Sequence, residues 1–159
     1  MSSESFLFFW SGPFSQWHPS PFTLGGVTYN CAEQYMMAGK ARLFGDSVRE
    51  QLIMANAAPD VQQSLGREVA GFDPDVWAAH ARSIVYRGSM AKYQQNADLR
   101  EHLLATGTRI LVEASATDRV WGIGLRATDP RAKHRNTWRG TNWLGEILTQ
   151  VRDELAAGI

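Results

Sequence analysis

The chain has the sequence YNCAEQYMMAGKARL from Tyr29 to Leu43, and the pattern of these residues predicts the helix around which the fold is built. Asn30 is a favourable N-cap residue, and Glu33 lies three positions on, where the acidic partner of a capping box is expected. Apolar residues at helical spacing supply one face, and they are Tyr35, Met36, Ala38 and Leu43. The pattern therefore predicts a helix over 31–43.

Two short apolar stretches before this helix predict strands. The run FLFFW at 6–10 is bounded by Ser11-Gly12-Pro13, which is typical of a short buried strand that ends in a turn. A loop that contains Pro19, Pro21, Gly25 and Gly26 follows, and it leads into a second short strand over 27–29.

The rest of the chain is mainly helical. Start and stop signals predict helices over 46–56, 59–66 and 74–94, and a further helix that restarts at Asn96 and ends at Thr106-Gly107. A compact β-branched run predicts a strand over 110–112, and 121–141 is a long loop. Thr141 is expected to cap a last amphipathic helix that extends to Leu155. We therefore expect a single α+β domain over 1–159, mostly helical with a few short strands.

The composition excludes several classes of protein. Sixteen Lys and Arg residues balance sixteen Asp and Glu residues, so any attraction to nucleic acid has to come from a local patch. The one cysteine, Cys31, cannot form a disulfide within the chain, and four scattered histidines give no zinc-type cluster. We expect no metal and no cofactor. No stretch approaches the roughly 20 apolar residues that cross a bilayer, and no signal-peptide pattern is present, so a cytoplasmic location is expected.

Glu33 and Lys40 are the first candidates for chemistry. Their separation is close to two helical turns, which places both side chains on one face of the predicted helix, about 10 Å apart along its axis. A carboxylate and an amine in one cleft act as acid, base, electrostatic stabiliser or nucleophile once burial tunes their pKa values. The alternative is that Glu33 completes the capping box and Lys40 is solvated, and the spacing alone leaves both readings open.

A second group of candidates follows the strand at 110–112. Asp118 precedes the motif Trp121-Gly122-Ile123-Gly124, whose glycines permit either the close approach of a ligand or a tight turn beside the indole. Asp118 is a candidate carboxylate, and equally a residue that caps a turn by accepting backbone N–H groups. The loop 125–140 is rich in Arg and Lys, and such a loop either binds phosphate or is simply solvated.

The order of these motifs resembles that of the YbiA/NADAR family. The stretch FSQWHPSPF at 14–22 is similar to its SNFYPSPF element, with Gln16 in place of Asn, and 29–41 is similar to its Y-x-S-x-E-Q-Y helix, with Cys31 in place of Ser. Further matches follow in the family's order, and they are Leu65-Gly66-Arg67, Trp77, Ala91-Lys92-Tyr93-x-x-Asn96, Leu103-Leu104-x-Thr106-Gly107, Leu111-Val112-Glu113-Ala114-Ser115, Asp118-x-x-Trp121-Gly122-Ile123-Gly124 and Asn142-x-Leu144-Gly145.

This resemblance implies a compact α+β domain that hydrolyses N-glycosidic bonds without a cofactor. It implies catalytic roles for Glu33, Asp118, Lys40 and Trp77. The residues expected to bind substrate are Trp17, Tyr35, Arg67, Lys92, Trp121, Gly122, Gly124 and Asn142.

The resemblance also suggests the substrate class. Activities of the family are the removal of ADP-ribose from guanine in nucleic acid and the cleavage of ribosylated pyrimidine intermediates of riboflavin biosynthesis. We expect the first of these, with the second as the alternative. An alternative from another class is a non-catalytic module that binds ADP-ribose or nucleotides. In each case the partner is a nucleotide-like small molecule or a modified nucleic acid, and no membrane is involved.

Overall fold

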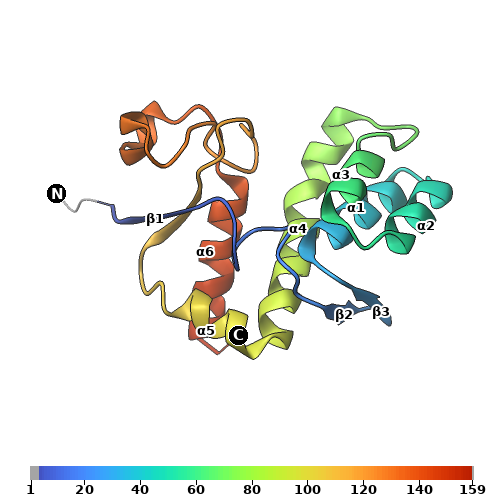
Figure 1. Ribbon diagram of the computed structural model, residues 1–159, viewed down its shortest axis with the longest axis horizontal. Helices are drawn as coiled ribbons and strands as arrows, with labels where there is room; N and C mark the ends of the chain where they lie inside the picture. The colour runs from blue at the N-terminus through green and yellow to red at the C-terminus, as the bar shows by residue number, and fades with distance from the viewer. Residues whose placement is uncertain (1–3, 159) are drawn as a thin grey trace. The chain divides into compact units, whose positions relative to one another are not determined.

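The computed structural model describes residues 4–158, which divide into two units (Figure 1). The central unit is Gln16–Ala97, and the terminal unit combines the chain up to Ser15 with the chain from Asp98 onward. The described residues form helices with a few short strands, so the predicted α+β class is confirmed. A single domain over 1–159 stays a prediction. No helix within residues 4–158 is long and apolar enough to cross a membrane.

The central unit is built around α1 (Ala32–Leu43). This helix packs against α2 (Ser47–Ala55), α3 (Pro59–Gly66) and α4 (Pro74–Gln95), and all four agree with the predicted helices to within one residue at each end. Because three helices surround α1, every residue from Ala32 to Ala38 is buried. The sequence predicts that only one apolar face of this helix is buried, whereas its first two turns are buried on all sides. Glu33 and Gln34 are therefore buried polar residues.

The predicted cap of α1 is wrong by one residue. The N-cap is Cys31, and Gln34 is the residue that reaches back, since its Oε1 accepts the N–H of Asn30 at 2.7 Å. The amide of Asn30 instead donates to Ala57 O and accepts from Gln62 Nε2. Tertiary partners thus replace the local cap, and the capping-box position falls on Gln34 and not on Glu33.

A β-hairpin precedes α1, where the sequence predicts only its second strand. β2 (Phe22–Leu24) pairs antiparallel with β3 (Val27–Tyr29), and 22–24 was expected to be loop. The two-residue turn is Gly25-Gly26, and both residues have positive φ, as a tight hairpin turn requires. The side-chain amide of Gln95 in α4 bonds both the N–H and the C=O of Thr23, which satisfies the other edge of β2.

The terminal unit contains a parallel strand pair. β1 (Phe6–Phe9) lies beside β4 (Ile110–Glu113) in a register that runs from Phe6 opposite Ile110 to Phe9 opposite Glu113. Both strands were predicted. A parallel pair needs a crossover connection, and here the crossover contains the whole central unit. The helix α5 (Ala97–Leu104) precedes β4, as expected.

The C-terminal helix α6 (Trp143–Ala156) packs on β4. Thr149 Oγ1 accepts the N–H of Leu111 at 3.0 Å, so the helix covers the edge of β4 that β1 leaves open. The expected cap, Thr141, is wrong: its hydroxyl bonds Val120 O, and the N-cap is Asn142, in the left-handed region at φ 53°.

The predicted long loop before α6 is confirmed, and it contains two short 3₁₀ turns, η1 (Pro130–Lys133) and η2 (Arg135–Thr137). Its residues close a small core. The fully buried members of this core are Val112, Ile123, Leu125 and Ala132, with Phe6, Phe8, Ile110 and Trp138 packed against them. The loop is therefore anchored at both ends and in the middle by apolar packing.

Candidate active site

Glu33 lies in the first turn of α1, and its side chain is only 3% exposed. Its backbone N–H donates to Gln16 O at 2.9 Å, so the segment that resembles the SNF element is tied to the start of α1. Lys40 lies two turns further along the same face of the helix. The predicted juxtaposition of carboxylate and amine along one helix face is therefore present.

Lys40 is held by two aromatic rings. Its Nζ lies 4.6 Å from the centroid of the Phe72 ring and 5.5 Å from that of Trp77, and it makes no hydrogen bond or ion pair within residues 4–158. Burial lowers the pKa of Lys40. The negative charge of Glu33 acts in the opposite direction, and the positive charge of Arg67 lowers the pKa further. The structure thus gathers four predicted site residues of the central unit, which are Glu33, Lys40, Arg67 and Trp77.

Phe72 is a residue that the sequence reasoning missed. It directly precedes Asp73, the N-cap of α4, whose carboxylate accepts the N–H groups of Asp75 and Val76. Phe72 and Trp77 therefore occupy the two positions of a hydrophobic staple, one before the cap and one in the first turn. That local signal, already present in the sequence, could have placed Phe72 beside Trp77.

The other predicted residues of the central unit lie in varied surroundings. Lys92 is 1% exposed, and burial lowers its pKa to about 7. Tyr35 is buried, with its ring edge-on to Tyr29 at 4.9 Å. Trp17, in contrast, is 42% exposed. Only Trp17 of these three offers a large accessible ring.

Cys31 is a buried thiol and not an activated nucleophile. Its Sγ donates to Gln62 Oε1 at 3.3 Å, and the side chain is 2% exposed. Burial is the largest influence on its pKa, which is raised. A raised pKa disfavours the reactive thiolate.

In the terminal unit, Asp118 caps a turn. Its Oδ1 accepts the N–H groups of Val120 at 2.9 Å and Trp121 at 2.8 Å, while Oδ2 accepts no hydrogen bond from the residues described. The turn-capping prediction is therefore confirmed. One carboxylate oxygen remains available for a second role.

The glycines of the WGxG motif are required by backbone packing. The segment 119–123 pairs with 139–144 through five main-chain hydrogen bonds. A Cβ on Gly122 would lie 2.8 Å from Glu113 O, and Gly124 has φ +69°. The side chain of Asn142 bonds Glu113 N and Leu111 O, and Trp121 packs edge-on against Trp143. Gly122, Gly124 and Asn142 thus all have structural contacts that account for their residue type.

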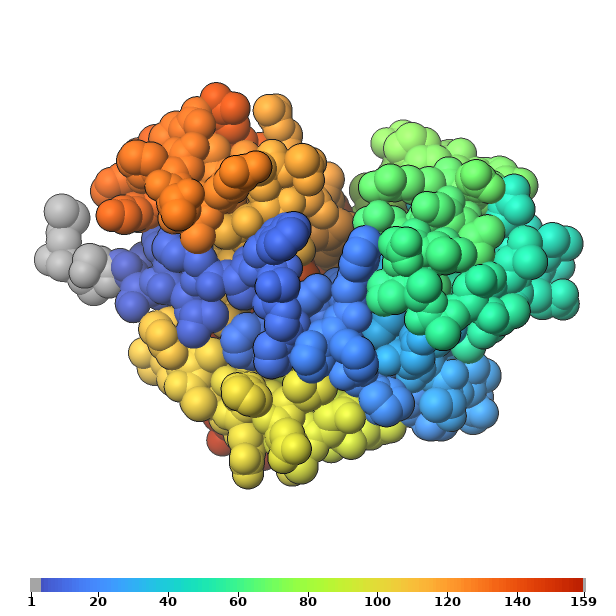
Figure 2. All heavy atoms as spheres, in the orientation of Figure 1, coloured from blue at the N-terminus to red at the C-terminus, as the bar shows by residue number. Residues whose placement is uncertain are grey.

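Part of the basic loop is already neutralised within the terminal unit. Arg131 pairs with Asp129 at 2.7 Å, and Arg135 pairs with Glu4 at 2.7 Å while lying over the Trp138 ring. Figure 2 shows the segment, in orange, at the surface of the unit. The cations of this loop that make no ion pair with any described residue are Arg126, Lys133 and Arg139.

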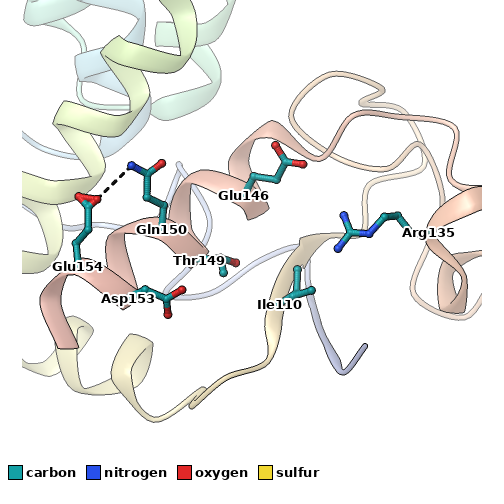
Figure 3. A pocket seen from close by; sticks show the side chains of 7 residues that line it. All are labelled: Ile110, Arg135, Glu146, Thr149, Gln150, Asp153 and Glu154. Atoms are coloured by element: carbon teal, nitrogen blue, oxygen red, sulfur yellow. Dashed lines mark hydrogen bonds between the residues drawn. The ribbon is translucent and has the colours of Figure 1, made fainter. Parts of the chain in front are cut away.

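Two surface cavities are lined mainly by residues outside the predicted site. One, of about 530 Å³, is lined by α6, Ile110 and Arg135, and Figure 3 shows Arg135 reaching toward the α6 side chains, where Gln150 bonds Glu154 at 3.1 Å. The other, of about 420 Å³, lies between α4 and the β2–β3 hairpin, with Tyr29 and Tyr35 in its lining. Of the predicted site residues, only Tyr35 lines either cavity.

Comparison with known proteins gives consistent matches over nearly the whole chain. The NADAR domain model matches residues 8–156. N-glycosidase R617 of Acanthamoeba polyphaga mimivirus is 44% identical over 146 residues, which are 89% of this chain and 86% of that protein. N-glycosidase YbiA of Escherichia coli K12 is 30% identical over 145 residues, or 91% and 82% of the two chains. The NMR structure of the E. coli protein YbiA has a TM-score of 0.80 at 28% identity and covers 99% of this chain and 89% of that one.

Proposed function

Because the chain belongs to the NADAR family and is a hydrolase of N-glycosyl bonds, we propose that its substrate is ADP-ribosylated guanine in nucleic acid. The reaction adds water across the bond between ribose C1′ and the base nitrogen, and it releases ADP-ribose and unmodified guanine. The observation that carries the catalytic proposal is Lys40, an amine with a lowered pKa between two aromatic rings, on the same helix face as a buried carboxylate.

Glu33 is the central carboxylate in this proposal. Cleavage of the C1′–N bond builds positive charge on C1′ and the ring oxygen, and electron density on the departing base. A fixed carboxylate stabilises the first charge and orients or deprotonates water, which is worth on the order of 10²–10⁴-fold in rate. The burial of Glu33 supports this role, because low dielectric strengthens its interaction with a developing cation.

Lys40 gives a second route through the same residues. The neutral amine attacks C1′ of the opened ribose and displaces the base nitrogen, which leaves with a proton. The Schiff base that results between Lys40 and C1′ is then hydrolysed by water, which frees the amine and the ribose aldehyde. The lowered pKa of Lys40 and its lack of an ion pair within residues 4–158 support this chemistry. Borohydride added during turnover distinguishes the two routes. A stable adduct on Lys40 supports the amine route, and its absence supports direct attack by water.

The other predicted residues support binding and orientation in this proposal. Trp77 and Trp121 present rings that stack on or border the base, and Arg67 is a guanidinium suited to phosphate. Asp118 is the second carboxylate, by analogy with glycoside hydrolases, which divide the work between two such groups.

The experiment that tests the proposal compares two substrates in parallel. The protein is incubated with an oligonucleotide that carries ADP-ribosylated guanine and, separately, with a ribosylaminopyrimidine phosphate, and the release of ADP-ribose or base is measured. We expect release from the oligonucleotide. Release from the pyrimidine alone would assign the second substrate, and release from neither would contradict both assignments.

The pyrimidine is kept as a second candidate because of one observation. Arg131 and Arg135 are engaged with Asp129 and Glu4, so the basic loop has fewer cations for a nucleic-acid backbone than its composition suggests. A small phosphorylated substrate needs only one or two cations. If the substrate is the ADP-ribosylated oligonucleotide, the double variant Arg126→Gln, Lys133→Gln cleaves it less efficiently. If the substrate is the ribosylaminopyrimidine phosphate, the same variant turns it over at an unchanged rate.

A further inference from the structure

Glu113, at the end of β4, is held in place by its own backbone. Its N–H donates to Asn142 Oδ1 at 3.0 Å, and its C=O accepts the N–H of Ile123 at 3.0 Å. The next N–H, of Ala114, bonds Phe9 O across the strand pair at 2.8 Å. The Cα–Cβ direction of Glu113 is therefore fixed by three segments of the terminal unit.

One carboxyl oxygen of Glu113 has no hydrogen-bond donor in the part of the chain that the structure describes. Its Oε2 is buried and accepts no hydrogen bond from any residue between 4 and 158. A Cβ on Gly122 would lie 3.2 Å from this oxygen, so the glycine is what leaves room for the carboxyl beside the turn. A buried carboxylate without a donor carries a large desolvation cost, and the neutral acid carries much less.

Asp118 is the charged group that acts on this carboxyl. Its Oδ1 accepts two backbone N–H groups, whereas Glu113 Oε2 accepts none from the residues described. Burial first, and then the charge of Asp118, raise the pKa of Glu113 to about 7. The cations beside this turn are Arg119 and Arg139, since a Cβ on Gly124 would lie 3.1 Å from a side-chain carbon of each. Burial without a donor therefore favours the protonated form of Glu113.

We propose that Glu113 is a positioning residue for Asp118, and that its protonated form keeps the turn 118–124 in the arrangement required for N-glycoside cleavage. This inference rests on the proposed function, since the role of Asp118 in the reaction is part of that proposal. When Glu113 loses its proton, a buried negative charge without a donor lies beside Gly122 and is repelled by Asp118, which loosens the turn that presents Asp118 and Trp121.

A direct titration tests the pair without any substrate. In protein labelled with ¹³C at the glutamate carboxyls, the signal assigned through Glu113→Gln titrates near pH 7. In Asp118→Asn this titration moves toward the ordinary range of glutamate. A Glu113 signal that titrates near 4.5 in the unsubstituted protein, or one that Asp118→Asn leaves in place, would overturn the inference.

Activity profiles test the positioning role. We expect kcat/KM of the unsubstituted enzyme to fall as pH rises through about 7. Glu113→Gln, which mimics the neutral acid, keeps activity at pH 6 within about threefold and loses this alkaline decline, while Glu113→Ala falls at least tenfold at every pH. An unchanged alkaline limb in Glu113→Gln, or loss of its activity at pH 6, contradicts the proposal.

Folding and substrate identity are controlled separately. The thermal midpoint of each variant shows whether lost activity reflects unfolding, and Glu113→Gln remains informative where Glu113→Ala does not fold. If the unsubstituted protein cleaves neither substrate, the substrate assignment fails, while the ¹³C titration still decides whether Glu113 and Asp118 form a coupled pair.

Discussion

At the scale of single residues, Glu33 combines burial with a place at the start of the central helix. Gln34, and not Glu33, reaches back to the N–H of Asn30 at the start of this helix. Substitution of Glu33 therefore tests chemistry more than helix stability. Glu50, paired with Arg42 on an exposed surface, offers a matched carboxylate outside the site.

We expect Glu33→Gln to lower kcat by on the order of 10²–10⁴-fold while the protein stays folded, because the amide can neither deprotonate water nor stabilise a cation. Glu50→Gln should leave kcat unchanged and cost at most about 1 kcal/mol of stability, the usual value of an exposed ion pair. Steady-state kinetics and thermal unfolding of both variants measure this. Comparable kinetics for the two would remove Glu33 from the mechanism.

The raised pKa of Glu113 also predicts how the free energy of unfolding changes with pH. Its folded-state pKa, about 7, exceeds the ordinary value of 4.5, so the folded protein binds this proton more tightly than the unfolded chain does. The contribution is fully present below pH 4.5 and is lost as pH rises through 7, in total about 3 kcal/mol. The free energy of unfolding, measured by urea denaturation from pH 4 to 8, should therefore fall relative to that of Glu113→Gln. Parallel curves for the two proteins would contradict this.

Which single residues the sequence reveals depends on how local their contacts are. Asp118 caps its turn through hydrogen bonds to the N–H groups two and three residues further along the chain. Because these partners are local, the sequence offers this role for Asp118. The cap of α1 was wrong because Asn30 is satisfied by Ala57 and Gln62, which are distant in sequence. Glu113 was not predicted as a site residue, because its burial beside Gly122 and the lack of a donor for its Oε2 within residues 4–158 appear only in the folded chain.

At the scale of elements, glycines set how closely helices approach. A Cβ on Gly88 of α4 would lie 2.6 Å from the ring of Tyr35, so only glycine allows this contact with α1. At Gly39 of α1, a Cβ would meet a methyl group of Ile84 at 3.0 Å. The tyrosine ring is fixed by its contacts with Phe22 and Tyr29, whereas an isoleucine methyl can shift.

Gly88→Ala is therefore expected to cost about 1–3 kcal/mol of unfolding free energy through overpacking. Gly39→Ala serves as the matched control: both glycines lie inside helices and gain the same propensity, but the new Cβ at 39 meets only a methyl group that can shift. This variant should stay within about 1 kcal/mol of the original. Urea unfolding of both variants tests the contrast. Equal losses would mean that the ring of Tyr35 adjusts as easily as Ile84.

The helices were predicted to within a residue or two because their signals are local: Asp73 caps α4 and Pro74 opens it. β2 was missed because three residues between prolines and glycines carry too little pattern, and its pairing depends on Gln95, far along the chain. The true cap of α6, Asn142, has a left-handed backbone held by its bonds to β4. Such non-local compensation cannot be read from the residues around Thr141.

At the scale of the whole molecule, equal numbers of acidic and basic residues leave no long-range field to attract a polyanion. Recognition of modified nucleic acid then depends on a few local cations. Arg131 and Arg135 are engaged in ion pairs, while Arg126 and Lys133 pair with no described residue. The number of phosphates contacted should be correspondingly small.

We therefore expect a shallow salt dependence for cleavage of the ADP-ribosylated oligonucleotide. Each phosphate contact to a single strand contributes about 0.7 to the slope of log kcat/KM against log salt, so two or three contacts give a slope between about −1.5 and −2. Lys133→Gln should reduce its magnitude by about 0.7, whereas Arg87→Gln, on the exposed face of α4, should not change it. The free ADP-ribosylated guanosine serves as the reference, since it lacks the strand. If the oligonucleotide and this nucleoside show the same slope, the enzyme contacts only the modified base and its ADP-ribose, and the basic loop has no part in choosing the substrate.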